Sequence, residues 1–407
     1  MAPSGKAGSA AMTHAHVLPE DADRARLIGR VWDVETGGPR VVAVRDGGVF
    51  DLHAVAGTVS ELLESSTVLA DVDSVTAQSP PRWQVSDLID ASLVQDPARP
   101  HLLAPIDLQV VKACGVTFVE SMIERIIEER TAGNPDRAAE VRASIGRTLG
   151  GGIAALRPGS PEAAATKRIL LDEGLWSQYL EVGIGPDPEV FTKAPVLSSV
   201  GVGAKIGIPS FSSWNNPEPE LVLIVNSVGT VAGATLGNDV NLRDVEGRSA
   251  LLLGKAKDNN ASSALGPFIR LFDGDFGLET VRNEEIRLRV DGPDGFRMEG
   301  VNNLARISRP FEELVAATMG DHHQYPDGFA LFTGTLFAPV ADREEPGQGF
   351  THKIGDVVTI RSAHLGALIN EVGATESLPA WSFGLRQLFD YLHTHPATPA
   401  PVAATTA

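Results

Sequence analysis

The feature that most constrains this chain is an apolar segment that opens with two carboxylates. It runs from Pro217 to Val225, with Glu218 and Glu220 at its start and aliphatic residues from Leu221 onward. Side chains two residues apart on a strand point to the same face, so both carboxylates share one face at the mouth of a buried strand. Paired carboxylates repel unless a cation lies between them, and their oxygens suit Mg²⁺, Mn²⁺ or Ca²⁺. The segment therefore predicts a divalent metal site.

The next segment supplies a third candidate ligand. Asn226 to Gly229 has the composition of a turn and Thr230 to Leu236 that of a returning strand, which together predict a hairpin. If Ser227 and Val228 form a two-residue turn, Asp239 lies on the same face as the two glutamates, near the same end of the hairpin. The alternative is a solvated acidic strand edge, which the flanking prolines and the long apolar run make less favourable.

The composition is that of a globular protein. The chain has 407 residues, of which 43% are hydrophobic, enough to bury a substantial core. A net charge of -18 at pH 7, without a visible basic patch, argues against nucleic acid or an anionic membrane as a partner. No run of about 18 apolar residues predicts a membrane span, and the single cysteine, Cys114, excludes an internal disulfide. We expect a cytoplasmic protein.

Shifts in composition divide the chain into segments. Residues 1–25 are rich in Ala, Ser and Gly, lack the apolar core of a secretory signal, and predict a disordered start, as residues 395–407 predict a disordered tail. Between them we expect a small N-terminal α/β domain over residues 26–100 and a catalytic domain over residues 101–394. Charged helical stretches over about 119–180 have the character of a lid, and strands separated by turn residues dominate from Glu218 onward.

Several motifs, taken in order, resemble the fumarylacetoacetate hydrolase superfamily. They are Glu218-Pro219-Glu220-Leu221, Gly237-Asn238-Asp239-Val240, Lys257, Gly266-Pro267, Thr333-Gly334-Thr335 and Lys353-Ile354-Gly355-Asp356. The resemblance runs from about Val110 to Val372. It implies an α+β fold with a mixed β-roll catalytic domain, a helical lid and a small N-terminal α/β module. It also implies Mg²⁺ as cofactor, with Mn²⁺ as the alternative, and a homodimer or dimer of dimers.

Within the superfamily, the chain most resembles bacterial 2-keto-3-deoxy-D-xylonate dehydratases. The shared segments are Gly115-Val116-Thr117-Phe118, residues 174–181 and residues 255–260. This resemblance implies dehydration of 2-keto-3-deoxy-D-xylonate, a small sugar acid, to 2,5-dioxopentanoate in oxidative pentose breakdown. A metal held by Glu218, Glu220 and Asp239 would polarise the ketone and acidify the C3 protons.

The residue at position 121 favours dehydration over hydrolysis. Hydrolases of the superfamily carry Gly-x-Asn-Tyr-x-x-His-x-x-Glu, whose His and Glu activate water, whereas this chain has Ser121 at the histidine position and retains Glu124. Serine alone is not a base at neutral pH. The alternative is a hydrolase that cleaves a 2,4-diketo-3-deoxy acid to pyruvate and a short hydroxy acid. A third interpretation is a metal-stabilised binding protein without turnover.

The resemblance also implies which residues perform the proton transfers. Glu124, Glu189 and Lys257 are the candidates for removing a C3 proton and assisting departure of the C4 hydroxyl, and the division of roles among them is open. Lys257 is in addition expected to approach the substrate oxygens.

Three further residues are candidates for binding substrate. Arg243 can pair with the substrate carboxylate, although an ion pair with Asp244 or Glu246 is an equally good interpretation. Thr335 can donate a hydrogen bond to the carboxylate or belong simply to a tight turn. Ser121 is the third candidate.

Overall fold

The computed structural model describes residues 17–132, 134, 137, 156–172, 174–336, 342–343 and 349–397. Of the two segments expected to be disordered, residues 1–16 and 398–407 lie outside this part. Residues 17–25 are ordered, which corrects the expected boundary at residue 25. Val17 is buried and its carbonyl accepts from the Ala367 amide at 2.9 Å, while Asp21 pairs with Arg270 at 2.7 Å. These contacts hold the segment against the main body.

An 11-stranded mixed sheet forms the centre of the molecule, in the order β4-β3-β2-β1-β13-β11-β10-β16-β6-β7, with β5 paired to β1. Only β16 and β6 run parallel among its pairs of described strands; the other pairs are antiparallel. The strands are β1 (Leu27–Asp33), β2 (Gly38–Arg45), β3 (Gly48–Asp51), β4 (Trp83–Gln84), β5 (His101–Leu102), β6 (Val110–Gly115), β7 (Glu189–Ala194), β10 (Pro219–Val225), β11 (Val231–Asp239), β13 (Ser263–Leu271) and β16 (Phe329–Phe332).

A second, five-stranded sheet packs against the first. Its order is β15 (Arg297–Asn303), β14 (Glu285–Asp291), β17 (Val357–Ser362), β18 (Gly366–Ala374) and β8 (Lys205–Ile208). A short pair, β9 (Asn215–Asn216) with β12 (Asn241–Leu242), lies beside them. One core cluster contains Leu221 and Leu236 from the large sheet and Ile286, Ile360 and Leu368 from the second. The expected α+β fold is confirmed.

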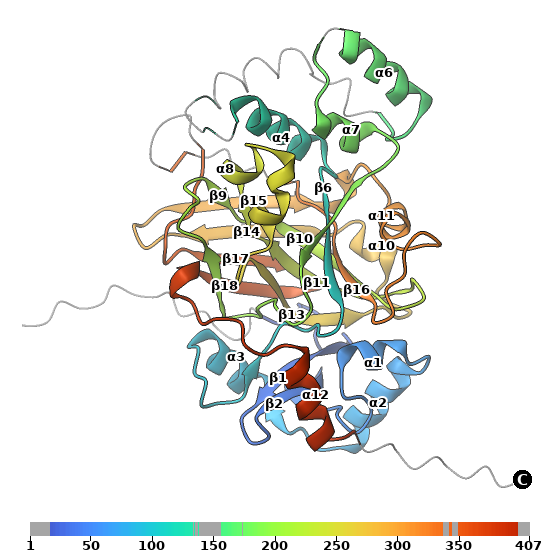
Figure 1. The fold of residues 1–407 in the computed structure, drawn as a ribbon. Coiled ribbons are helices and arrows are strands. Elements are labelled where there is room, and N and C mark those ends of the chain that lie inside the picture. The colour runs from blue at the N-terminus through green and yellow to red at the C-terminus, as the bar shows by residue number, and fades with distance from the viewer. Residues whose placement is uncertain are drawn as a thin grey trace, which may run out of the picture.

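Helices gather at the two ends of the sheets. Figure 1 shows α4 (Val119–Thr131), α6 (Pro161–Asp172) and α7 (Gln178–Ile184) at one end, and α1 (Val59–Glu64), α2 (Val68–Gln78), α3 (Val85–Leu93) and α12 (Leu385–Thr394) at the other. The short helices are α8 (Arg243–Glu246), α9 (Leu253–Lys257) and α10 (Leu278–Val281), and α11 (Phe311–Thr318) lies beside the sheets. No helix in the described ranges is long and apolar enough to cross a bilayer.

The N-terminal strands are part of the central sheet. β1 pairs with β13, with Leu27 opposite Arg270, so strands from residues 26–100 and from the catalytic segment form one surface. At the far end of the chain, α12 returns to this module: the hydroxyls of Tyr391 and Thr36 lie 3.1 Å apart. The ring Nε2 of His53 lies 2.7 Å from the carbonyl oxygen of His395, so this first residue of the expected disordered tail is held in place.

The hairpin predicted around residue 227 forms, but its turn differs from the prediction. The loop between the strands spans residues 226–230, and the register shifts between Ile224 and Val225. The side chain of Asn226 accepts from the amide of Thr230 at 2.9 Å. This local hydrogen bond favours the longer loop over the predicted two-residue turn, which is wrong.

Candidate metal centre and active site

The three predicted metal ligands lie together. Glu220 in β10 is opposite Gly237 in β11, and the Asp239 amide donates to the Glu218 carbonyl at 3.1 Å, which places Asp239 across from Glu218. One carboxylate oxygen from each of Glu218, Glu220 and Asp239 lies within 4.8 Å of the others, and all three residues are buried. The changed turn shifts the register by an even number of residues, so the shared face is retained.

Glu220 is the least compensated of the three carboxylates. Its Oε2 accepts from the Gly334 amide at 2.6 Å, and no ion pair to it is recorded among the described residues. Burial, followed by repulsion from Asp239 and Glu218, raises its pKa well above the ordinary value. A bound divalent cation would offset that repulsion, so this all-oxygen donor set fits Mg²⁺ or Mn²⁺.

A glycine is required for the backbone contact to Glu220. Gly334 has φ of +91°, and a Cβ added there would lie 2.0 Å from the hydroxyl oxygen of Thr117. A side chain would therefore push the amide away from the carboxylate. Thr335, the expected substrate-binding residue, follows it and is buried.

Two lysines hold the carboxylates. Lys257, at the end of α9, places Nζ 2.8 Å from Glu218 Oε2 and 3.0 Å from Asp239 Oδ2. Lys193, in β7, places Nζ 2.8 Å from Asp239 Oδ1 and donates to the Lys257 carbonyl at 2.6 Å. Burial lowers the pKa of Lys193. Burial also acts to lower the pKa of Lys257, but Asp239 and Glu218 outweigh it and raise that pKa.

Lys193 was not among the residues predicted from the sequence. The one available signal was a charged residue within the short strand Glu189–Ala194, and it did not distinguish an inward from an outward side chain. The structure shows that Lys193 is fully buried and ties a predicted metal ligand to the backbone of Lys257.

Glu189 begins β7 and lies close enough to Glu218 and Asp239 for their charges to affect its pKa. It lies opposite Gly115 of β6, where an added Cβ would come within 1.9 Å of Glu189 Oε2. Burial raises the pKa of Glu189, partly opposed by the positive charges of Arg125 and Lys257, while Glu218 adds to the increase. A raised pKa makes a carboxylate a stronger base, which suits it to proton transfer.

The side chain of Arg243 pairs with two carboxylates of helix α4. Its Nε donates to Glu128 Oε1 at 2.7 Å and its Nη2 to Glu124 Oε2 at 3.1 Å, and the guanidinium lies 4.1 Å from the ring centre of Trp214. The partners are therefore not Asp244 or Glu246, the two candidates from the sequence. The partner carboxylates lie on helix α4, more than a hundred residues earlier in the sequence. Local spacing around Arg243 does not reveal such a distant contact.

Arg125, also on α4, joins this ion-pair network to the candidate metal site. Its Nη1 lies 2.7 Å from Glu128 Oε2 and 3.0 Å from Glu246 Oε2, and its Nη2 donates to Glu218 Oε1. Burial acts to lower the pKa of Arg125, but Glu128, Glu246 and Glu218 outweigh it and raise that pKa well above the ordinary value. Sequence analysis missed Arg125, Glu128 and Glu246.

Helical spacing could have suggested this set. Ser121, Glu124, Arg125 and Glu128 recur at three- and four-residue intervals on α4, so their side chains share one side of the helix. Ser121 is half-buried and its hydroxyl donates to the Phe118 carbonyl at 2.9 Å.

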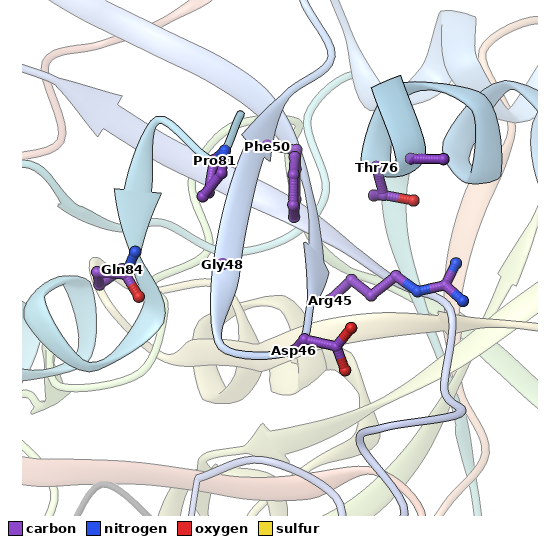
Figure 2. Close-up of a pocket in the computed structure, with 8 residues that line it drawn as sticks. Arg45, Asp46, Gly48, Phe50, Thr76, Pro81 and Gln84 are labelled. Atoms are coloured by element: carbon purple, nitrogen blue, oxygen red, sulfur yellow. The ribbon is translucent and has the colours of Figure 1, made fainter. Parts of the chain in front are cut away.

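A surface cavity of about 470 Å³ lies in the N-terminal module (Figure 2). Its lining includes Arg45, Phe50, Thr76 and Pro81, from β2, β3, α2 and the segment before β4. None of the predicted site residues contributes to it, so the candidate active site is separate from this cavity.

Comparison with known proteins matches part of the chain to a family and the chain to several relatives. Residues 180–373 match the family described as fumarylacetoacetate (FAA) hydrolase C-terminal. A curated relative in Haloferax volcanii, named probable 2-keto-3-deoxyxylonate dehydratase, is 26% identical over 338 residues, which cover 83% of this chain and 96% of the relative. The 2-dehydro-3-deoxy-D-arabinonate dehydratase of Saccharolobus solfataricus is 32% identical over 185 residues, which cover 46% of this chain and 58% of that enzyme.

Solved structures agree with the fold. The apo form of 2-keto-3-deoxy-D-arabinonate dehydratase aligns with a TM-score of 0.59 at 22% identity, covering 86% of this chain and 99% of that chain. The same enzyme complexed with magnesium and 2,5-dioxopentanoate aligns with a TM-score of 0.58, also at 22% identity and with the same coverage. The family match places residues 180–373 of the chain in the fumarylacetoacetate hydrolase family, and the solved structures show that the chain shares their fold.

Proposed function

We propose that this protein is a metal-dependent hydro-lyase that converts a 2-keto-3-deoxypentonate, with 2-keto-3-deoxy-D-xylonate as the substrate, to 2,5-dioxopentanoate and water. The observation that carries this proposal is the buried triad of Glu218, Glu220 and Asp239 with Lys257 beside it. The names of both curated relatives support the substrate class. Magnesium and 2,5-dioxopentanoate in the structurally similar enzyme support the cofactor and product.

The triad would hold Mg²⁺, or Mn²⁺ in its place, which when bound supplies the positive charge that stabilises an enolate developing on a 2-oxo acid. The protein's own groups then transfer protons. Glu189 takes a C3 proton, because its raised pKa makes it a stronger base than an ordinary carboxylate. Lys257 donates to the substrate oxygen on which charge develops, and Glu124 assists departure of the C4 hydroxyl as water.

Loss of a C3 proton and the C4 hydroxyl releases water and leaves a C3–C4 double bond. Loss of a C5 proton with protonation at C3 moves the double bond to C4–C5, and tautomerisation of that enol, by loss of its hydroxyl proton and protonation at C4, gives the C5 aldehyde. The proposal requires no activated water. This agrees with the presence of Ser121, because its hydroxyl donates to the Phe118 carbonyl and, unlike a histidine ring, is not a base at neutral pH.

Product identity tests the proposal. Purified protein with Mg²⁺ is incubated separately with 2-keto-3-deoxy-D-xylonate, its enantiomer at C4, and a 2,4-diketo-3-deoxypentonate, and each reaction is followed by proton NMR. We expect 2,5-dioxopentanoate from the first. Formation of that product from the enantiomer alone would change the substrate assignment. Pyruvate and glycolate from the diketo acid alone would instead establish the hydrolase.

A further inference from the structure

Four cationic side chains surround the candidate metal site, and they differ in exposure. The side chain of Arg125 is 12% exposed, compared with 3% for Lys257, 2% for Arg243 and 0% for Lys193. Arg125 is therefore the cation of this group that a ligand entering from solvent can contact.

Arg125 also has donors to spare. A guanidinium has five N–H donors. The recorded contacts of Arg125 join its Nη1 to Glu128 and Glu246 and its Nη2 to Glu218. The hydrogen bonds to Glu128 and Glu218 use one hydrogen on Nη1 and one on Nη2, and the contact with Glu246 is an ion pair. No recorded contact with a described residue uses the Nε hydrogen or the second Nη2 hydrogen.

The other two structural cations are held by buried partners. Arg243 lies between Glu124, Glu128 and the ring of Trp214, and its Nη1, which has no hydrogen-bond partner among the described residues, is buried. Lys193 lies among Asp239 and the carbonyls of Val240 and Lys257. Neither can turn to a substrate without leaving a buried carboxylate or carbonyl without its partner, which is costly.

We propose that Arg125, rather than Arg243, binds the carboxylate of the 2-oxo acid. A planar guanidinium suits a carboxylate because it can donate two parallel hydrogen bonds. Arg125 contacts the metal ligand Glu218 directly, so an acid bound beside the triad comes within its reach. Ser121 lies one helical turn earlier on α4 and places a hydroxyl on the same side. This assignment takes the class of ligand, a 2-oxo acid, from the proposed function. It does not require that the protein turns that acid over.

The test measures binding without turnover. Oxalate, a planar mimic of the enolate of a 2-oxo acid, is titrated by calorimetry into Mn²⁺-saturated wild-type protein and into Arg125→Gln, Arg125→Lys and Arg130→Gln. Arg130 is exposed on the same helix and is the matched control. The Mn²⁺ dissociation constant of each protein is measured first, and circular dichroism confirms that each is folded.

We expect Arg125→Gln to weaken oxalate binding by about 10- to 100-fold, the effect of losing one hydrogen bond to a charged group. We expect Arg125→Lys to recover part of the affinity, Arg130→Gln to match wild type, and Mn²⁺ binding not to weaken in Arg125→Gln. Equal oxalate affinity in Arg125→Gln and wild type would overturn the assignment, as would a loss that parallels weaker Mn²⁺ binding. Failure of the wild type to bind oxalate would also overturn it. None of these results depends on whether the protein dehydrates a pentonate.

Discussion

Glu218 and Glu220 share a strand face but not an environment. Glu218 contacts Arg125 and Lys257, so both of its oxygens face cations. Glu220 instead accepts from the Gly334 amide, and its pKa is raised by burial and by its acidic neighbours. The uneven sharing of positive charge leaves one buried carboxylate for which a bound cation is the natural partner.

Glu218→Gln tests the triad at the level of one atom. Replacing an anionic oxygen by an amide nitrogen removes a ligand, and we expect Mn²⁺ affinity to fall by more than about 100-fold, since loss of outer groups alone costs about 10- to 100-fold. Calorimetric titration measures the change. Glu64→Gln, at the opposite end of the hairpin where Glu64 accepts from the Ser227 amide, is the control. Unchanged metal affinity in Glu218→Gln would remove Glu218 from the ligand set.

Titration of Glu246 makes the free energy of unfolding depend on pH. Burial raises its pKa to about 7, with Arg125 acting in the opposite direction. Because the folded protein holds this proton more tightly than the unfolded chain, the resulting stabilisation is fully present below about pH 4.5 and is lost as pH rises through about 7.

We therefore expect the free energy of unfolding of wild type, relative to Glu246→Gln, to decline by up to about 3 kcal/mol between pH 5 and pH 8. Urea unfolding of both proteins at several pH values measures the difference. A difference that is constant across this range would show that Glu246 does not titrate there.

At the scale of elements, helix α4 is attached to α8 mainly by charge. Arg243 of α8 binds Glu124 and Glu128 of α4, and Arg125 of α4 binds Glu246 of α8. These pairs are buried, so removing one partner leaves an uncompensated charge in a poorly solvated position. The position of α4 relative to the metal site therefore depends on this network.

Arg243→Met should loosen α4. We expect a loss of about 3–5 kcal/mol in the free energy of unfolding or in local opening, because Glu124 and Glu128 lose a buried partner. Hydrogen exchange of the amides in residues 119–131 measures local opening, and urea unfolding measures the global change. Arg282→Met, which breaks exposed pairs with Glu279 and Glu312, should cost less than about 1 kcal/mol. Unaltered exchange in α4 would show that apolar packing holds the helix.

Sequence alone predicted some elements well and others not at all. The parity of the hairpin placed Asp239 on the same face as Glu218 and Glu220, because strand alternation is a local property. The turn was mispredicted, because the side chain of Asn226 accepts a hydrogen bond from the Thr230 amide and stabilises the longer loop. Lys193 and Arg125 were missed, since they reach the site only after β7 and α4 have packed against strands distant in sequence.

At the scale of the whole molecule, the N-terminal module and the catalytic segment share one sheet. β1 pairs with β13, which is buried along its length, and α12 packs back onto the module. The sequence suggested separate domains because residues 26–100 contain no catalytic group, and a change in composition does not reveal continuous strand pairing. The homodimer or dimer of dimers implied by family resemblance stays a prediction.

Deletion of residues 1–100 should therefore prevent folding of the rest. Loss of β1 exposes a row of unpaired backbone groups on β13, which favours aggregation. We expect residues 101–407 to be recovered folded only when residues 1–100 are co-expressed as a separate fragment. Cooperative urea unfolding of the isolated 101–407 fragment would contradict this and establish an independent domain.

The most direct test of the account is the rate of 2,5-dioxopentanoate formation from 2-keto-3-deoxy-D-xylonate as a function of free Mg²⁺, using protein stripped of metal with a chelator. We expect no product without metal, and a rate that rises and saturates as Mg²⁺ is restored, because we assign the ion's binding site to Glu218, Glu220 and Asp239. The same rate in excess chelator as in Mg²⁺ would contradict a metal-dependent dehydratase.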